Sequence, residues 1–80
     1  MKHYVYALLS KTNGSLYIGM TTNVHRRLQQ HNIGKTRSTK KFTPYTIIYT
    51  EEWPDRISAR EREKYLKSGI GREFIKTIIS

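Results

Sequence analysis

Asn13-Gly14 lies between two runs of strand-forming residues and constrains the start of the chain more than any other feature. The first run covers residues 4–9 and the second covers residues 16–20. An Asn-Gly pair between two such runs is typical of a tight β-hairpin turn. The sequence therefore predicts that these two runs pair as antiparallel strands.

The register of this hairpin decides which side chains share a face. A two-residue turn pairs Ser10 with Tyr17 and places Tyr6 opposite Thr21, with both tyrosines on one face. A turn lengthened by two residues keeps that face and shortens the distance between the rings. Gly19 on the same face has no side chain and is expected to leave space for a ligand. The alternative is that both rings are ordinary half-buried strand tyrosines. The opposite face is predicted to be core, with Val5, Ala7, Leu9, Leu16, Ile18 and Met20.

The rest of the chain predicts one more strand and three helices. Capping residues at 21–23 precede a helix that Asn32-Ile33-Gly34 ends. Residues 35–41 contain no apolar side chain and are predicted to be an exposed basic loop. A third strand is expected at 45–50, with Pro44 at its start.

Two glycines divide the C-terminal part. A helix is predicted at about 57–68 and ends at Gly69, and Gly71 is expected to separate it from a last helix that contains Phe74. The order β-β-α-β-α-α indicates an α+β fold, with a three-stranded antiparallel sheet flanked by helices. We expect residues 1–80 to form a single domain.

Charge indicates the class of partner. The chain has 15 Lys and Arg residues against 6 Asp and Glu, a formal net charge of +9, which attracts polyanions. Nucleic acid is the first partner to consider, and a basic surface that serves only solubility is the alternative. The absence of cysteine excludes disulfides and thiolate metal sites. With no apolar run long enough to cross a bilayer and no secretory start, we expect a cytoplasmic protein.

Two helical patterns carry candidate chemistry. Arg27 and His31 stand four residues apart and face the same way, which suits phosphate contact and proton transfer, although such pairs are common on solvated helices. Glu63 is a candidate ligand for Mg²⁺, which needs only one or two protein carboxylates. The alternative is an ion-pair ladder in which Glu63 and Lys67 are successive members.

Four motifs follow one another along the chain. They are Tyr4-Val5-Tyr6, Tyr17-Ile18-Gly19, Arg27 with His31, and Glu63 within residues 59–67. In this order the motifs resemble the GIY-YIG nuclease superfamily, and in particular its small, stand-alone bacterial members. The resemblance extends over nearly the whole chain.

The resemblance implies a site and a reaction. The reaction is hydrolysis of a nucleic-acid phosphodiester, with DNA as the expected substrate and DNA repair or recombination as the setting. Glu63 would hold one Mg²⁺ or Mn²⁺, Arg27 would meet the charge that builds on the phosphorane, and Tyr6 would be the general base. The site residues that the resemblance assigns are Tyr6, Tyr17, Arg27, His31 and Glu63, with Tyr17 orienting the water or phosphate and His31 sharing the proton.

Residues 35–41 are expected to follow the nucleic-acid backbone without sequence preference, through Lys35, Arg37, Lys40 and Lys41. Sequence selectivity is therefore expected to be weak, or to come from the substrate's structure or from a partner protein.

Two departures from the family's pattern support a second hypothesis. The first motif contains no glycine, and no asparagine follows Glu63. The alternative is a nucleic-acid binding module that keeps the scaffold and the basic face with little or no turnover. A third hypothesis is a basic protein-interaction or ribosome-associated protein whose tyrosines belong only to the core. Tyr6 and Tyr17 on opposite faces of the sheet would favour it.

Overall fold

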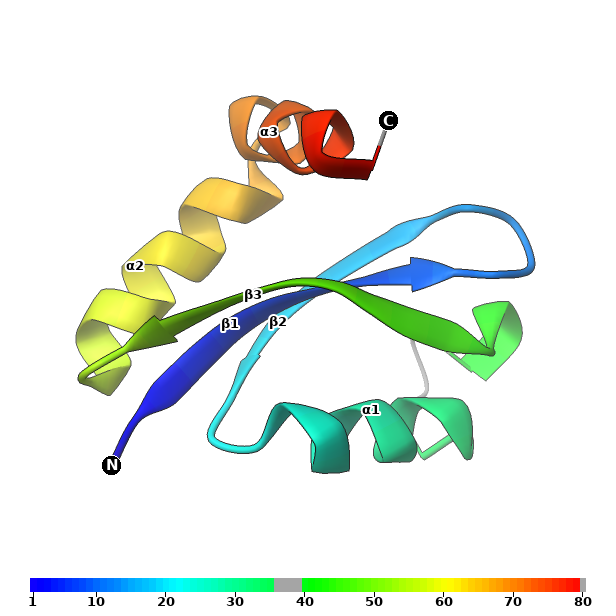
Figure 1. Cartoon of the computed structure of the whole chain (residues 1–80), viewed down its shortest axis with the longest axis horizontal. Helices are drawn as coiled ribbons and strands as arrows, with labels where there is room; N and C mark the ends of the chain where they lie inside the picture. The colour runs from blue at the N-terminus through cyan, green and yellow to red at the C-terminus, as the bar shows by residue number, and fades with distance from the viewer. Residues whose placement is uncertain (36–39, 80) are drawn as a thin grey trace.

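The computed structural model describes residues 1–35 and 40–79, and Figure 1 shows their arrangement around one sheet. In this part of the chain, the sheet has three antiparallel strands in the order β2-β1-β3. The predicted order of strands and α-helices is confirmed. The elements are β1 (His3–Ser10), β2 (Leu16–Thr21), α1 (Val24–Asn32), a short 3-10 helix (Lys40–Phe42), β3 (Tyr45–Trp53), α2 (Arg56–Lys67) and α3 (Gly69–Ile79).

The β1–β2 hairpin has a longer connection than the predicted two-residue turn. Its last bond joins the Ser10 N–H to the Ser15 carbonyl at 2.9 Å, which leaves four residues in the loop. Tyr6 therefore lies opposite Gly19, and not opposite Thr21 as the short turn predicted. Because the register differs by two residues, Tyr6 and Tyr17 stay on the same face.

Both faces of the sheet are covered, and each has its own core (Figure 1). On one face α2 and α3 pack on β1 and β2, through Val5, Ala7, Ile18, Ala59, Leu66 and Ile75. On the other face α1 packs over a second cluster of Tyr6, Leu8 and Tyr45. The sheet therefore has no open face, and Tyr6, only 1% exposed, is part of a core.

A two-residue connection leads into each of α1 and α2 and ends in a capping side chain. The Asn23 side chain accepts a hydrogen bond from the Arg26 N–H at 3.0 Å, and the Asp55 side chain accepts one from the Ser58 N–H at 2.7 Å. Each bond satisfies a backbone donor that the first helical turn leaves unpaired. These caps fix where α1 and α2 begin.

Gly71 lies within α3, so the prediction that it separates two helices was wrong. A Cβ at this position would lie 2.2 Å from the Tyr65 carbonyl oxygen and 2.4 Å from the Leu66 Cα. The missing side chain is needed because α3 crosses closely over the end of α2. The third strand also continues past its predicted end at residue 50, to Trp53.

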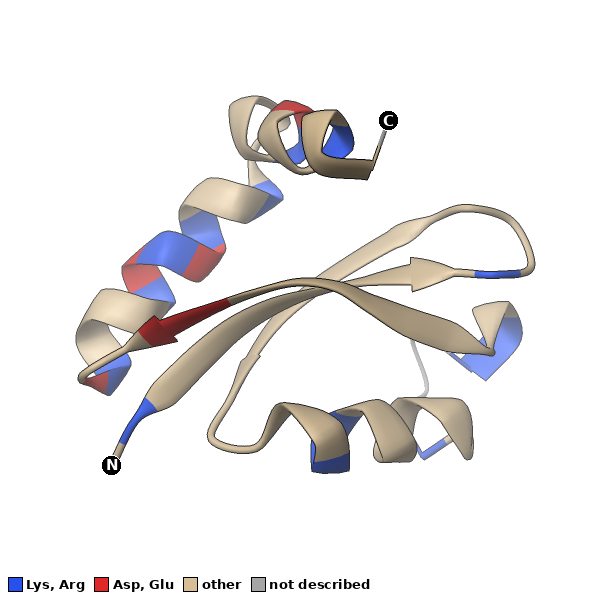
Figure 2. Ribbon diagram, in the orientation of Figure 1, with Lys and Arg blue, Asp and Glu red and all other residues tan. Residues whose placement is uncertain are grey.

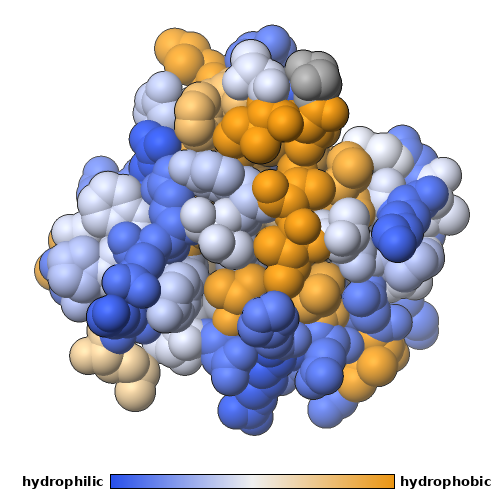
Figure 3. Space-filling view, viewed as in Figure 1, coloured by the Kyte–Doolittle hydropathy of each residue, from blue (hydrophilic) through white to orange (hydrophobic). Residues whose placement is uncertain are grey.

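The apolar side chains of α3 are only partly covered. Ile75 is fully buried, whereas Ile70 and Ile78 are 72% and 43% exposed. Figure 3 shows apolar atoms over α3 and down the middle of this face, with hydrophilic atoms near α1 at the bottom. No helix within the described residues has the length and apolar character that a membrane span requires.

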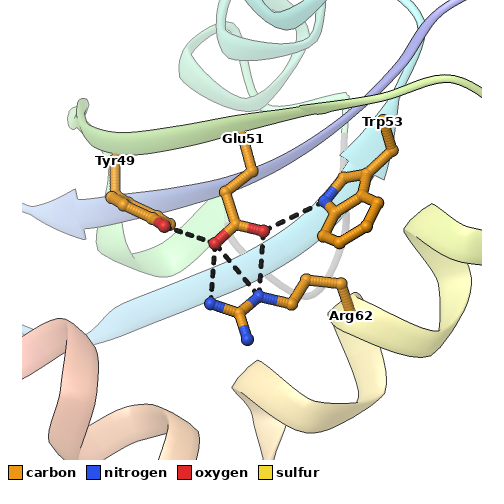
Figure 4. A network of polar contacts seen from close by, with 4 residues as sticks. All are labelled: Tyr49, Glu51, Trp53 and Arg62. Carbon is orange, nitrogen blue, oxygen red and sulfur yellow. Dashed lines mark hydrogen bonds and ion pairs between the residues drawn. The ribbon is translucent and has the colours of Figure 1, made fainter.

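A group of four side chains, here called the Glu51 network, joins β3 to α2 (Figure 4). The Glu51 carboxylate accepts two hydrogen bonds from Arg62 Nε, at 2.9 and 3.0 Å, and one from its Nη2 at 2.8 Å. Trp53 Nε1 donates at 3.0 Å, and the Tyr49 hydroxyl donates as well. Burial opposes ionisation of Glu51, but these bonds and the Arg62 charge hold its pKa below the usual value. The Glu51 network therefore fixes α2 against the sheet.

Candidate active site

Three side chains from β1, β2 and α1 meet under α1, and we call them the Tyr6 cluster. The Tyr6 hydroxyl lies 3.2 Å from His31 Nε2 in a buried hydrogen bond. The rings of Tyr17 and His31 pack edge to face with centroids 4.6 Å apart, and those of Tyr6 and Tyr17 are 6.3 Å apart. Residues that are up to 25 positions apart in the sequence thus form one group.

Gly19 has a different role from the one predicted. A Cβ at this position would lie 2.6 Å from the Tyr6 hydroxyl oxygen and 3.1 Å from a ring carbon of Tyr17. The space above Gly19 is therefore filled by the Tyr6 cluster and is not open to a ligand. Only glycine allows the Tyr6 ring to lie this close to β2.

Burial keeps Tyr6 and His31 uncharged at neutral pH. Burial raises the pKa of Tyr6 to about 12, helped by Tyr17, although a hydrogen bond and the charge of Arg27 act against this shift. Burial, followed by the charge of Arg27, lowers the pKa of His31 to about 4. A tyrosine that acts as a free general base needs the opposite shift. The sequence-based expectation that Arg27 and its neighbours would favour a Tyr6 anion does not agree with this pKa.

Arg27 lies beside the Tyr6 cluster and also lines a hollow at the surface. Its side chain is half-buried, and Nη1 donates to the Gln30 Oε1 at 2.8 Å. It lines a mainly polar hollow of about 370 Å³ together with Arg26 and Gln30 from α1 and with residues 20–23. Arg26 and Gln30 were not among the site residues predicted from the sequence. The position of Gln30 three residues after Arg27 was the available signal.

A second hollow of about 630 Å³ shares Thr22 and Asn23 with the first. It is lined by Tyr4, Val24 and Ile47, and neither hollow is lined by the Tyr6 cluster itself. The smaller hollow is the candidate site because it is lined by Arg27, which lies close enough to Tyr6 and His31 to shift their pKa values, and the larger hollow is not.

Glu63 lies on α2, across the sheet from α1. Its side chain is 8% exposed, with Arg60 Nη1 2.7 Å from Oε1 and Lys67 Nζ 3.0 Å from Oε2. Burial opposes its ionisation, but Lys67 and Arg60 outweigh burial and hold its pKa below the usual value. Glu63 does not line the hollow that contains Arg27. It does lie within electrostatic range of Tyr6, whose pKa its charge raises.

A known family of protein domains matches most of this chain. The sequence profile described as the GIY-YIG catalytic domain covers residues 2–73. The chain belongs to the GIY-YIG domain family. This is a family of nuclease domains, so the predicted resemblance is confirmed.

The chain is also similar to several proteins named UPF0213. It is 40% identical to the UPF0213 protein SH2523 of Staphylococcus haemolyticus, over 96% of this chain and 94% of that one. It is also 40% identical to the UPF0213 protein NP_0776A of Natronomonas pharaonis, over 82% and 78%. The solution NMR structure of the UPF0213 protein BH0048 from Bacillus halodurans superposes with a TM-score of 0.58 at 33% identity, covering 98% of this chain and 85% of that chain. These likenesses agree with the observed fold.

Nucleases of the GIY-YIG family generally use a divalent metal, and the donor chemistry of this chain can be tested against that use. Among the described residues, no three His, Cys, Asp or Glu side chains lie close enough together to hold an ion. Glu63 is a single buried carboxylate. It suits Mg²⁺ or Mn²⁺ held mainly by water and substrate oxygens, and not an ion held by protein groups alone. Glu63 therefore fits a divalent ion for which the protein supplies a single carboxylate.

The structure describes three of the four residues that were predicted to follow the nucleic-acid backbone. Lys35, Lys40 and Lys41 are exposed, and Lys40 and Lys41 belong to the 3-10 helix instead of a loop. Arg37 lies outside the described residues. Figure 2 shows basic residues on α1 and the 3-10 helix, whereas acidic residues occur on α2, α3 and the end of β3. The α1 side of the molecule is therefore the more purely basic one.

Proposed function

We propose that this GIY-YIG domain is a metal-dependent endonuclease that hydrolyses DNA phosphodiester bonds with little sequence preference. The observation that supports this most is Arg27, which both lines a polar hollow and contacts the buried Tyr6 cluster electrostatically. A guanidinium in this position can bind a phosphate in the hollow while hydroxyl and imidazole groups lie beside it. The net charge of +9 attracts DNA to the site.

In this proposal the Tyr6 cluster moves a proton and Arg27 stabilises charge. His31 is neutral at pH 7, and the relay requires the tautomer in which Nε2 accepts a hydrogen bond from the Tyr6 hydroxyl, whose lone pair accepts one from the attacking water. The pair acts as a relay, because the pKa of Tyr6 is too high for a free tyrosinate. Arg27 stabilises the charge on the phosphorane, and Tyr17 orients the phosphate or water.

Glu63 is the proposed metal ligand. A divalent ion at this carboxylate would neutralise phosphate charge and increase the acidity of water. Because Arg60 and Lys67 hold both carboxylate oxygens, the ion has to replace one of them.

A cleavage assay tests the proposal. Purified protein is incubated with Mg²⁺ or Mn²⁺ and with linear, branched and single-stranded DNA, beside Glu63→Gln. Glu61→Gln is the matched control, because it makes the same change at an exposed position of α2. We expect the parent and Glu61→Gln to nick at least one substrate and Glu63→Gln to lose this activity. Absence of nicking by the parent, or full activity of Glu63→Gln, would reject the enzyme.

Each carboxylate oxygen of Glu63 already contacts a cationic side chain. This favours a second candidate, a DNA-binding module with little turnover. In that case DNA binding persists in Glu63→Ala and Tyr6→Phe. It weakens steeply with salt and with loss of Lys40 and Lys41. Binding without any metal-dependent nicking would establish this alternative.

A further inference from the structure

Both oxygens of Glu63 already have a cationic partner in the described structure. Arg60 Nη1 contacts Oε1 at 2.7 Å, and Lys67 Nζ contacts Oε2 at 3.0 Å. The Glu63 side chain is only 8% exposed, so little of its surface is open to an incoming ion. A divalent cation can therefore reach this carboxylate only if one of the two partners leaves.

Lys67 is the partner that can leave more easily. The two side chains are similarly exposed, Lys67 at 47% and Arg60 at 53%, but the Lys67 contact is the longer one, at 3.0 Å against 2.7 Å. An ammonium group is compact, strongly hydrated and carried on a flexible stem, whereas a guanidinium is a planar group that loses more when its hydrogen-bond geometry is broken. Lys67 is also the last residue of α2, so its side chain can turn toward solvent without disturbing a helical turn beyond it.

We propose that Lys67 is an exchangeable occupant of the metal position on Glu63, and that it couples metal binding to DNA binding. An approaching phosphate gives the Lys67 ammonium a new anionic partner, and its departure frees Glu63 Oε2 for the cation. This inference rests on the proposed function. It adds that the free protein binds the cation weakly and that the substrate increases this affinity.

Linkage makes the coupling measurable from either side. If DNA raises the affinity for the cation by some factor, the cation raises the affinity for DNA by the same factor. Removing the Lys67 charge eliminates the competitor, so the cation should bind tightly even without DNA. The coupling should then largely disappear, because DNA no longer has a competitor to remove.

The first experiment measures Mn²⁺ binding alone, by the electron paramagnetic resonance signal of the free ion. Lys67→Met is compared with Lys64→Met, which makes the same charge change at an exposed position of α2, while the two cations on Glu63 are Arg60 and Lys67. We expect Lys67→Met to bind Mn²⁺ about tenfold more tightly than Lys64→Met, as removal of a competing charge predicts. Thermal unfolding checks that both variants fold, which their exposed positions favour.

The outcomes separate this inference from the proposed function. Equal Mn²⁺ affinities of Lys67→Met and Lys64→Met, with binding lost in Glu63→Gln, would overturn the exchange and leave the metal ligand intact. Unchanged Mn²⁺ binding in Glu63→Gln would overturn the metal ligand of the proposed function, and the exchange with it.

The second experiment repeats the titration with a saturating phosphorothioate oligonucleotide that resists hydrolysis, and subtracts the Mn²⁺ bound by the same mixture with Glu63→Gln. We expect the oligonucleotide to tighten Mn²⁺ binding in the parent and in Lys64→Met, and to have little effect in Lys67→Met. An equal increase in all three proteins would show that Lys67 does not carry the coupling.

Discussion

The two faces of the sheet carry two tyrosine-containing polar groups that are built on opposite principles. In the Glu51 network, a carboxylate and a guanidinium neutralise each other, and Tyr49 and Trp53 complete the hydrogen bonds. In the Tyr6 cluster the buried groups are uncharged, and the nearest charge is Arg27 at the edge of a hollow. The Glu51 network pairs its own charges, whereas the Tyr6 cluster lies beside the cation Arg27, which faces the hollow.

This difference separates structural from chemical roles. A paired buried charge gives precise position, because any movement breaks several hydrogen bonds. A cation beside buried neutral groups has attraction left for an incoming anion. We therefore expect substitutions in the Glu51 network to change stability, and substitutions around the Tyr6 cluster to change activity.

The largest effect on stability is expected from Arg62→Met. The substitution leaves the Glu51 carboxylate, 15% exposed, without its cation. Loss of one partner of this partly buried, multiply hydrogen-bonded pair should lower the free energy of unfolding by about 3 kcal/mol. Urea unfolding measures this change, with Arg56→Met at an exposed position of the same helix as the control. An effect no larger than that of Arg56→Met would mean that the Glu51 network does not hold α2.

Arg27→Met should show the opposite behaviour. Because this guanidinium faces the hollow, its loss should lower the nicking rate by about 10²–10³-fold, as for other groups that stabilise transition-state charge. The free energy of unfolding should change by about 1 kcal/mol, well below the effect of Arg62→Met, since Arg27 is half-buried and hydrogen-bonds Gln30 and Tyr6 without belonging to an ion pair. Kinetics and urea unfolding of the same preparations give both values, again beside Arg56→Met. A stability loss as large as that of Arg62→Met would remove the contrast between the two groups.

Gly19→Ala tests how tightly the Tyr6 cluster is packed. The added Cβ would lie 2.6 Å from the Tyr6 hydroxyl oxygen, so the ring has to move. Overpacking of this kind costs about 1–3 kcal/mol, and nicking should decrease because the Tyr6–His31 bond is displaced. Gly69→Ala is the control, since nothing lies within 4 Å of its Cβ position. A stable and fully active Gly19→Ala would show that Tyr6 has room to move.

The sequence predicts the order of elements well because local signals determine it. The Asn13-Gly14 pair, the capping residues at 21–23 and the run of strand-forming residues at 4–9 each act over a few residues. The register of the hairpin is different. The Ser10 side chain bonds to the Phe42 carbonyl at 2.6 Å, a tertiary contact that favours the longer loop and has no signal in the local sequence. Gly71 was misread because a terminating glycine and a closely packed glycine look alike in a sequence.

The candidate site is predictable in its residue types and less so in its physical state. The motif order indicates Tyr6 and His31, which the structure brings into contact. The shift of the Tyr6 pKa depends on burial under α1, which no spacing reveals. The pairing of Glu63 with Lys67 was visible as an i, i+4 pair, because helical periodicity places the two on one face. The bond between Glu51 and Arg62 spans 11 residues and two elements, so it had no such signal.

His31 provides a pH-dependent test of the Tyr6 cluster. Its pKa is lowered from 6.5 to about 4 in the folded protein, so between these values the unfolded chain binds more protons. The resulting stability is complete above about pH 6.5 and is lost as pH falls toward about 4. Glu51 and Glu63, whose pKa values are lowered from 4.5, add a further loss as pH falls below about 4.5.

Unfolding at a series of pH values measures this dependence. The decrease between pH 6.5 and 4 should be flattened in His31→Asn and retained in His25→Gln, at an exposed position of α1. NMR titration adds a second measurement, since Arg27→Met should raise the pKa of His31. An unchanged His31 pKa in that variant would place Arg27 outside the electrostatic range of the Tyr6 cluster.

The smallest effect concerns the exposed lysines, which should contribute to binding and not to chemistry. Replacing Lys40 and Lys41 by glutamine removes two charges near α1 and leaves both buried groups intact. Each lost phosphate contact should reduce the slope of log affinity against log salt by about 0.9 for duplex DNA, without changing the nicking rate of bound DNA. Lys64→Gln with Lys76→Gln makes the same net change on α2 and α3, so a slope that changes equally in both pairs would show that DNA responds to total charge and has no preferred side.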